Sequence, residues 1–191
     1  SGISGVNHMT ALGTEGLHDQ AKGLDTLPLA NAAMILAEGQ IAAAAVLRTA
    51  APAITAAAGT LAKTIRAGGV IHYVAAGSSG LMAAADALEL GGTFSIPNTQ
   101  LRIHMAGGLP SGVEMPGETE DDLSGLDERF SALSERDTVI AVSASGTTPY
   151  TLEAARLSRA AGATIVGIAN NAGSALLDLA DHPILLATPP E

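Results

Sequence analysis

The 191-residue sequence has no cysteine, few aromatic residues and few basic ones. Without a thiol the chain has no disulfide, no thiolate nucleophile and no Cys-ligated zinc. Its aromatic side chains, Tyr73, Phe94, Phe130 and Tyr150, are too few for a base-stacking platform. Nine basic residues against 19 acidic ones give a net charge of −10, which is unsuited to neutralising a phosphate backbone. We therefore expect no nucleic-acid partner.

Long apolar segments are also missing. The longest apolar runs, such as 41–47, are far shorter than the roughly 18 residues that a membrane span needs. No apolar segment with a basic flank resembles a signal peptide. We therefore expect a cytoplasmic protein without a membrane partner. Residues 1–8 (SGISGVNH), which precede Met9, resemble an expression scar and do not enter the fold prediction.

Metal ions and nucleotide cofactors are not expected either. His18, His72, His104 and His182 lack the paired spacing that is typical of metal ligands. No loop ends in the GK[ST] of a P-loop, and the GSSG segment at 77–80 does not fit the GxGxxG pattern. The prediction is a protein with no metal and no cofactor.

The first third of the chain predicts an N-terminal helical arm over residues 9–68. Residues 26–48 and 51–67 are rich in alanine and predict two helices. We expect the break between them near Pro52, because proline disfavours a helical conformation in the residue before it and is favoured in a first helical turn.

The rest of the chain, residues 69–191, predicts one α/β domain. Short apolar runs alternate with helical patterns, which indicates a parallel sheet covered on both faces. We predict a three-layer α/β/α sandwich of the flavodoxin type, with a five-stranded parallel sheet and the N-terminal helices packed on it. The chain ends directly after the last run and a Pro pair, which suggests truncation of the domain. The runs are 70–76, 101–106, 137–143, 163–169 and 183–187.

One segment, 107–127, interrupts this alternation with Gly, Pro and six carboxylates. Such a composition is typical of a solvated surface loop. It can still contain a single residue that matters for function.

Two glycine- and hydroxyl-rich loops each join a predicted strand to a predicted helix. Ligands of open α/β sheets bind beyond the carboxyl ends of the strands, and helix N-termini hold anions without Lys or Arg. One such loop by itself is explained as well by N-capping, but two on neighbouring strands favour a phosphate site. The residues are Gly77, Ser78, Ser79 and Gly80 in the first loop, and Ser143, Ser145, Gly146, Thr147 and Thr148 in the second.

Seven short segments, spread from about Thr14 to the end of the chain, together match the pattern of a known family. They are Thr14-Glu15-Gly16 with Asp25, GSSG at 77–80, Asp86-Ala87-Leu88-Glu89, Met105-Ala106-Gly107-Gly108, Glu120-Asp121, Ser145-Gly146 with Thr148-Pro149-Tyr150, and Gly173-Ser174. With these segments the chain from about Thr14 to Glu191 resembles the SIS (sugar isomerase) domain family. Within that family it is similar to the branch of the N-acetylmuramic acid 6-phosphate etherases and the glucokinase regulatory proteins.

The resemblance implies a sugar-phosphate ligand and two catalytic carboxylates, which fall on Glu89 and Glu120. The implied reaction cleaves the D-lactyl ether at carbon 3 of a 6-phosphosugar by elimination and water addition, with one carboxylate as base and the other as acid. Two arginines of the etherase pattern are Leu81 and Thr147 here, and the family's Cys-Pro-Pro after the first Glu is Leu90-Gly91-Gly92. Losing two guanidinium groups removes bidentate contacts to phosphate or carboxylate.

Three functions therefore remain open. The first is an etherase-type lyase; the others are a non-catalytic phosphosugar sensor and an aldose–ketose phosphosugar isomerase, which needs the same proton abstraction at carbon 2. Glu89 lies ten residues beyond Ser79, about 15 Å along a helix. This separation predicts a homodimer in which Glu89 serves a pocket of the partner subunit, with the helices of 26–67 forming part of the contact.

Overall fold

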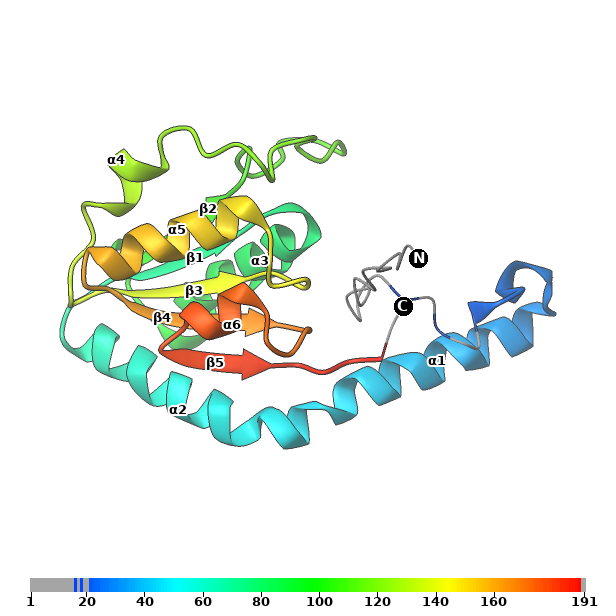
Figure 1. Ribbon diagram of the computed structural model, residues 1–191. Coiled ribbons are helices and arrows are strands. Elements are labelled where there is room, and N and C mark those ends of the chain that lie inside the picture. The colour runs from blue at the N-terminus through cyan, green and yellow to red at the C-terminus, as the bar shows by residue number, and fades with distance from the viewer. Residues whose placement is uncertain (1–15, 17, 19–20, 190–191) are drawn as a thin grey trace, which may run out of the picture.

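Five short parallel strands form the centre of the part of the chain that the structure describes (Figure 1). The computed structural model describes residues 16, 18 and 21–189, so the predicted scar at 1–8 and Glu191 lie outside the described residues. The strands lie in the order β2-β1-β3-β4-β5, and each neighbouring pair is parallel. They are β1 (Ile71–Ala75), β2 (Leu101–Met105), β3 (Thr138–Val142), β4 (Thr164–Ala169) and β5 (His182–Leu185).

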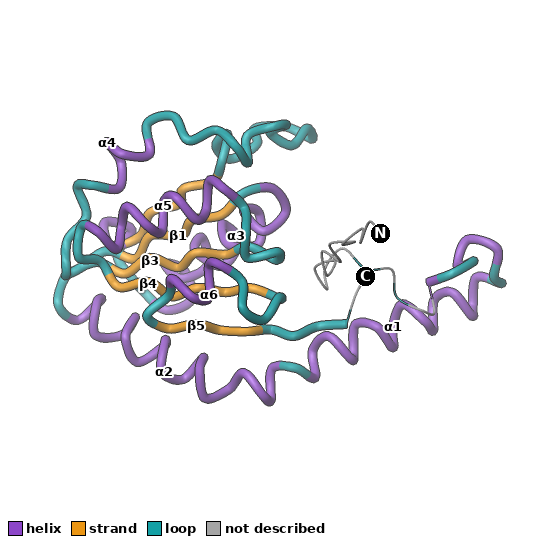
Figure 2. Tube along the Cα trace, in the orientation of Figure 1, coloured by secondary structure: helices purple, strands orange, loops and turns teal. Residues whose placement is uncertain are grey.

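Helices cover both faces of this sheet, which confirms the expected α/β/α sandwich (Figure 2). Successive strand residues point to opposite faces. Tyr73 and Ile140 therefore join the core beneath α2 and α3, while Val74 and Val139 join the core beneath α4, α5 and α6. The helices are α1 (Leu29–Ala45), α2 (Leu47–Arg66), α3 (Gly77–Phe94), α4 (Leu126–Phe130), α5 (Pro149–Ala160) and α6 (Ala175–Leu179), and two single turns are η3 (Leu24–Thr26) and η4 (Asn98–Gln100).

The break between the first two helices lies at Val46, so the prediction of a break near Pro52 was wrong. Pro52 lies inside α2, and the axes of α1 and α2 differ by 42°. A proline ring inside a helix collides with the carbonyl four residues earlier, here that of Arg48, so the distortion falls upstream of the proline. At the break the N–H of Val46 donates to the carbonyl of Ala43, three residues back instead of four.

Only one of the two N-terminal helices packs on the sheet. Ala50, Ala57 and Thr64 of α2 are buried, whereas α1 has no buried residue. In Figure 1, α1 extends away from the sandwich beyond the end of α2. No single helix among the described residues is long and apolar enough to cross a bilayer, although α1 and α2 together meet that test of length and composition as a bent pair.

Candidate functional site

The two hydroxyl-rich segments leave the same edge of the sheet side by side. β1 and β3 are neighbours, and Ala75 pairs with Val142 at their carboxyl ends. Crossovers leave this pair in opposite directions, toward β2 on one side and β4 on the other. This is the topological switch point where open α/β sheets bind ligands. The expectation that the two segments occupy neighbouring strand ends is confirmed.

The second segment, residues 143–148, is held by its own hydroxyl groups. Ser143 Oγ accepts the N–H of Gly146 at 3.0 Å and lies 2.8 Å from Thr148 Oγ1 and 3.2 Å from Ser145 Oγ. Ser145 Oγ in turn accepts the N–H and the hydroxyl of Thr147, at 3.2 and 3.0 Å. Thr148 takes the N-cap position of α5 without a side-chain capping bond. The hydroxyls therefore shape the loop rather than cap the helix.

The first segment, residues 77–80, is the first turn of α3 and not the loop that the sequence predicted. Gly77 has a φ of 56°, a left-handed conformation that glycine adopts without strain, so the helix begins directly at the strand end. Among the described residues, the N–H groups of Gly77, Ser78 and Ser79 and the hydroxyls of both serines have no partner. Free N–H groups at the positive end of a helix are the donors that an anion needs.

Gly80, the fourth residue of that turn, allows α3 to pack closely against β2. A β-carbon there would lie 2.7 Å from Cγ of Met105 on β2, so the glycine allows α3 to approach the sheet. Of the four residues predicted to bind ligand in this segment, the structure exposes Ser78, partly exposes Gly77 and Ser79, and buries Gly80.

Glu120 reaches this turn from the acidic segment between β2 and α4. A β-carbon on Gly77 would lie 2.9 Å from Glu120 Oε1, so the carboxylate rests against the first residue of α3. The carbonyl of Glu120 accepts the N–H of Tyr150 in the first turn of α5 at 2.9 Å. Glu120 thus joins the starts of both helices, and the side chain lies at the predicted anion site.

Glu89 lies elsewhere on α3. It follows Gly77 by twelve residues, which is about 18 Å at the rise of an α-helix. Its side chain is exposed, and it shares the outer surface of the helix with the exposed Leu81 and Leu88. Within one chain the structure therefore does not bring Glu89 and Glu120 together.

Ser174 is a candidate site residue that the sequence did not predict. It is 5% exposed, and its Oγ has no hydrogen-bond partner in the described part of the chain. A β-carbon on Gly146, whose φ is 71°, would lie 2.2 Å from this oxygen. Ser174 therefore sits directly under the 143–148 loop. The Gly173-Ser174 segment was visible in the sequence as a family match, but its contact with Gly146 was not.

A stacked histidine pair lies on the α4–α5 side of the sheet. His72 Nδ1 and His104 Nε2 are 3.0 Å apart, and the ring of His104 also contacts Phe130. Burial lowers the pKa of His104 to about 4, helped by the charges of His72, Arg129 and Arg102. Burial likewise lowers the pKa of His72. His72 is buried and His104 is half-buried, and the lowered pKa values keep both imidazoles neutral near pH 7. No cluster of three metal-ligating side chains occurs among the residues described.

These features define a class of protein: a parallel α/β sheet whose topological switch point offers hydroxyls and free N–H groups, instead of basic side chains, as candidate donors for an anion. The chain belongs to the SIS domain family, whose model matches residues 36–170.

Relatives of known name give a narrower comparison. The chain is 42% identical over 182 residues to an N-acetylmuramic acid 6-phosphate etherase of Deinococcus radiodurans, covering 93% of this chain and 59% of that protein. It is 34% identical over 184 residues to one of Burkholderia lata, covering 96% of this chain and 61% of that protein. The chain thus spans about three fifths of the length of these relatives.

Solved structures agree on the fold. Phosphoheptose isomerase GmhA of Neisseria gonorrhoeae superposes with a TM-score of 0.57 at 18% identity, covering 82% of this chain and 83% of that one. The NanR protein of Vibrio vulnificus, solved with ManNAc-6P, gives a TM-score of 0.56 at 20% identity over 91% of this chain and 58% of that one. At such identities the likeness supports the α/β sandwich alone.

Proposed function

We propose that this chain is the phosphosugar-binding part of an N-acetylmuramic acid 6-phosphate etherase, a lyase that yields N-acetylglucosamine 6-phosphate and D-lactate. The observation that carries the proposal is the contact of the Glu120 carboxylate with Gly77, beside the free donors of Ser78 and Ser79. This contact supports the proposal because a carboxylate, which can transfer a proton, lies beside a helix turn whose N–H groups are free to bind an anion. The identity with the D. radiodurans etherase supports the same reaction.

The sugar phosphate would bind across the two segments. The free N–H groups and hydroxyls at Ser78 and Ser79 would donate to the phosphate, and Ser145 and Thr147 would turn their hydroxyls from each other to the ligand. Glu120 would then face the sugar carbons. Binding energy at the distant phosphate positions carbon 2 for deprotonation.

The reaction needs an acid and a base on the sugar. The base removes the proton at carbon 2, the bond between carbon 3 and the lactyl oxygen breaks, and the acid protonates the departing oxygen; water then adds to carbon 3. We assign this chemistry to Glu120 and Glu89. Because Glu89 lies about 18 Å along α3 from Gly77, the residue that the Glu120 carboxylate contacts, Glu89 would act in the pocket of a partner subunit. The active form in this proposal is therefore a homodimer.

The proposal also includes the domain boundaries of the chain and the cellular compartment of the protein. Residues 9–68 would be the helical arm and 69–191 the SIS domain that holds the ligand. A substrate of this kind is a polar metabolite, and the expected compartment is the cytoplasm.

A phosphosugar sensor is the second candidate function. Leu81 and Thr147, which stand where the etherase pattern has arginine, favour it because they leave the pocket without a guanidinium group. Thr147 is exposed at the loop, and Leu81 follows directly on the anion-binding turn. A sensor would keep the binding donors and need no proton transfer.

D-Lactate release from N-acetylmuramic acid 6-phosphate by the natural full-length protein separates the two functions. We expect release by the wild type, its loss in Glu120→Gln with binding retained, and little effect of Asp121→Asn, a matched change of the neighbouring exposed carboxylate. Binding without release by the wild type would replace the lyase with the sensor.

A further inference from the structure

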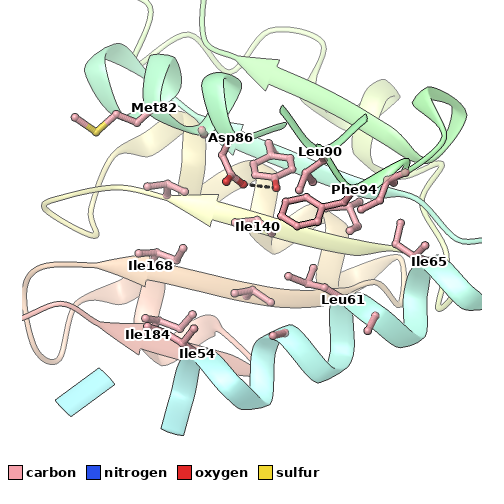
Figure 3. A pocket seen from close by; sticks show the side chains of 18 of the residues that line it. Ile54, Leu61, Ile65, Met82, Asp86, Leu90, Phe94, Ile140, Ile168 and Ile184 are labelled. Carbon is pink, nitrogen blue, oxygen red and sulfur yellow. Dashed lines mark hydrogen bonds between the residues drawn. The ribbon is translucent and has the colours of Figure 1, made fainter. Parts of the chain in front are cut away.

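A large apolar groove lies between α2 and α3, with the sheet as its floor (Figure 3). Its volume is about 960 Å³, and Ile54, Leu61 and Met82 are among the apolar side chains that line it. The chain spans about three fifths of the length of its relatives, so the groove by itself identifies no occupant. A second cavity is polar, and its side chains define the chemistry of a ligand.

The polar cavity lies at the carboxyl end of the edge strand β2, beside α4 and the first turn of α5. Its volume of about 530 Å³ is within the range of small-molecule sites, which is about 300–1,000 Å³. Gly107, with a φ of 74°, turns the chain out of β2, and a β-carbon there would lie 2.5 Å from Cβ of Pro116. The acidic segment therefore packs back against this end of β2 and helps to form the cavity.

Two hydrogen-bond donors line the cavity side by side. Tyr150 is 4% exposed, and its hydroxyl accepts a long bond of 3.4 Å from Arg129 Nη1. Burial raises the pKa of Tyr150 against the effect of Arg129, so the phenol stays protonated, and its O–H has no acceptor among the described residues. Arg129 has no carboxylate partner in that part of the chain. A guanidinium beside a phenol O–H is suited to binding a carboxylate.

Asp122 brings the opposite charge to the same cavity. It is exposed, and its Oδ1 accepts the N–H of Ser124 at 2.9 Å. Hydrogen bonds from the hydroxyl and the N–H of Ser124 lower the pKa of Asp122, so the carboxylate is ionised near pH 7. Asp122 and Arg129 form no ion pair, although both lie close enough to Tyr150 to act on its pKa. The cavity thus presents a cation and an anion that do not pair with each other.

This arrangement of charges selects the class of ligand. A phosphate or a simple carboxylate would be attracted by Arg129 and repelled by Asp122, and an amine would meet the reverse. A small zwitterion satisfies both groups, because its ammonium donates to Asp122 while its carboxylate accepts from Arg129 and Tyr150. Met105 and Leu109 add apolar surface for the carbon skeleton of such a molecule.

We propose that the polar cavity binds a small zwitterion, the chemistry shared by free amino acids and dipeptides, between Arg129 with Tyr150 and Asp122. This binding is independent of the lyase proposed above. The cavity is nevertheless linked to Glu120, because the N–H of Tyr150 donates to the Glu120 carbonyl at 2.9 Å and Asp122 follows two residues later. A ligand held by both residues restrains the segment that carries Glu120.

Calorimetry with the natural full-length protein tests the two charges separately. The probes are glycine and glycylglycine, each compared with its N-acetylated form, which lacks the ammonium, and its amide, which lacks the carboxylate. We expect the better of the two zwitterions to bind at least tenfold more tightly than either of its blocked forms. Tighter binding of glycine would identify an amino-acid site, and tighter binding of glycylglycine a dipeptide site.

Two variants assign the charges to their residues. Asp122→Asn should bind the zwitterion no better than the acetylated form, and Arg129→Gln should bind it no better than the amide. Both side chains are exposed, so the Tm should be unchanged. Asp121→Asn is the matched control, an exposed neighbouring carboxylate that does not line the cavity, and it should keep full selectivity.

The opposite results would overturn the proposal. No binding of either zwitterion at millimolar concentration would refute the site, and so would a selectivity that survives in both variants. The link to Glu120 rests on the proposed function and has its own measurement. Saturating zwitterion should raise the affinity for the phosphosugar at least threefold in the wild type and not in Arg129→Gln. An unchanged affinity in the wild type would refute that link, while the binding measured without phosphosugar decides the site itself.

Discussion

The Glu120 carboxylate lies against Gly77, close enough that a β-carbon on the glycine would come within 2.9 Å of Oε1. This contact joins the acidic segment to the start of α3. Position 77 requires glycine for two reasons: a β-carbon would collide with the carboxylate, and the backbone has a φ of 56°.

Gly77→Ala should therefore impair both stability and ligand binding. We expect the free energy of unfolding to fall by about 1–3 kcal/mol, because alanine is strained at positive φ and would displace Glu120. Urea denaturation and phosphosugar titration measure the two effects. Gly92→Ala is the matched control: it lies in the same helix with nothing within 4 Å of the new β-carbon, and it should stabilise by up to about 1 kcal/mol. Equal effects of the two variants would contradict the special place of Gly77.

Sugar 6-phosphates should stabilise the domain, and the same sugars without phosphate should not. At 100 times its Kd a ligand adds about 2.7 kcal/mol to stability, which is readily seen as a shift in Tm. Ser79→Ala and Ser145→Ala should each weaken binding by roughly 1–3 kcal/mol through loss of a hydroxyl donor. Equal Tm shifts with and without the phosphate would rule out an anion site, and unchanged affinity of a variant would make that serine purely structural.

Gly146→Ala should disrupt the 143–148 loop. Its β-carbon would lie 2.2 Å from Ser174 Oγ and 2.4 Å from Ser174 Cβ, at a residue with φ of 71°. Affinity for the phosphosugar should fall at least tenfold by calorimetry. Ser174→Gly in the same chain removes both atoms and should restore part of that affinity. No recovery would show that the backbone conformation, rather than Ser174, sets the requirement for glycine.

Acid should destabilise the fold through His104. Its pKa is about 4 in the folded chain, below the usual 6.5, so the unfolded chain binds the proton first. The stability contributed by the neutral ring is complete above about pH 6.5 and is lost as the pH falls toward 4. At 1.36 kcal/mol per unit this amounts to about 3 kcal/mol at most. Urea unfolding at pH 7.5 and pH 4.5 should show a smaller acid loss in His104→Gln than in the wild type; an identical loss would place the sensitivity elsewhere.

Much of the fold was predictable because its signals are local. A run such as 70–76 is apolar without alternation, and this pattern alone indicates a strand buried on both faces. Five such runs with helices between them lead to a parallel sandwich. Glycine and serine after two of these runs likewise predicted that the two segments lie at neighbouring strand ends. The Pro52 prediction failed because steric strain from a proline ring acts on the preceding turn, so the helix continued through Pro52 and broke at Val46.

What only the tertiary structure decided are contacts between residues far apart in sequence. Glu120 approaches Gly77, and Ser174 underlies Gly146, through packing of separate elements, which no local pattern specifies. The same holds for the groove between α2 and α3 and for the bare surface of α1. Composition determined that these surfaces are apolar. Whether an apolar residue is covered by its own chain depends on where the helices end up in space, and for α1 the direction set at Val46 leaves it uncovered.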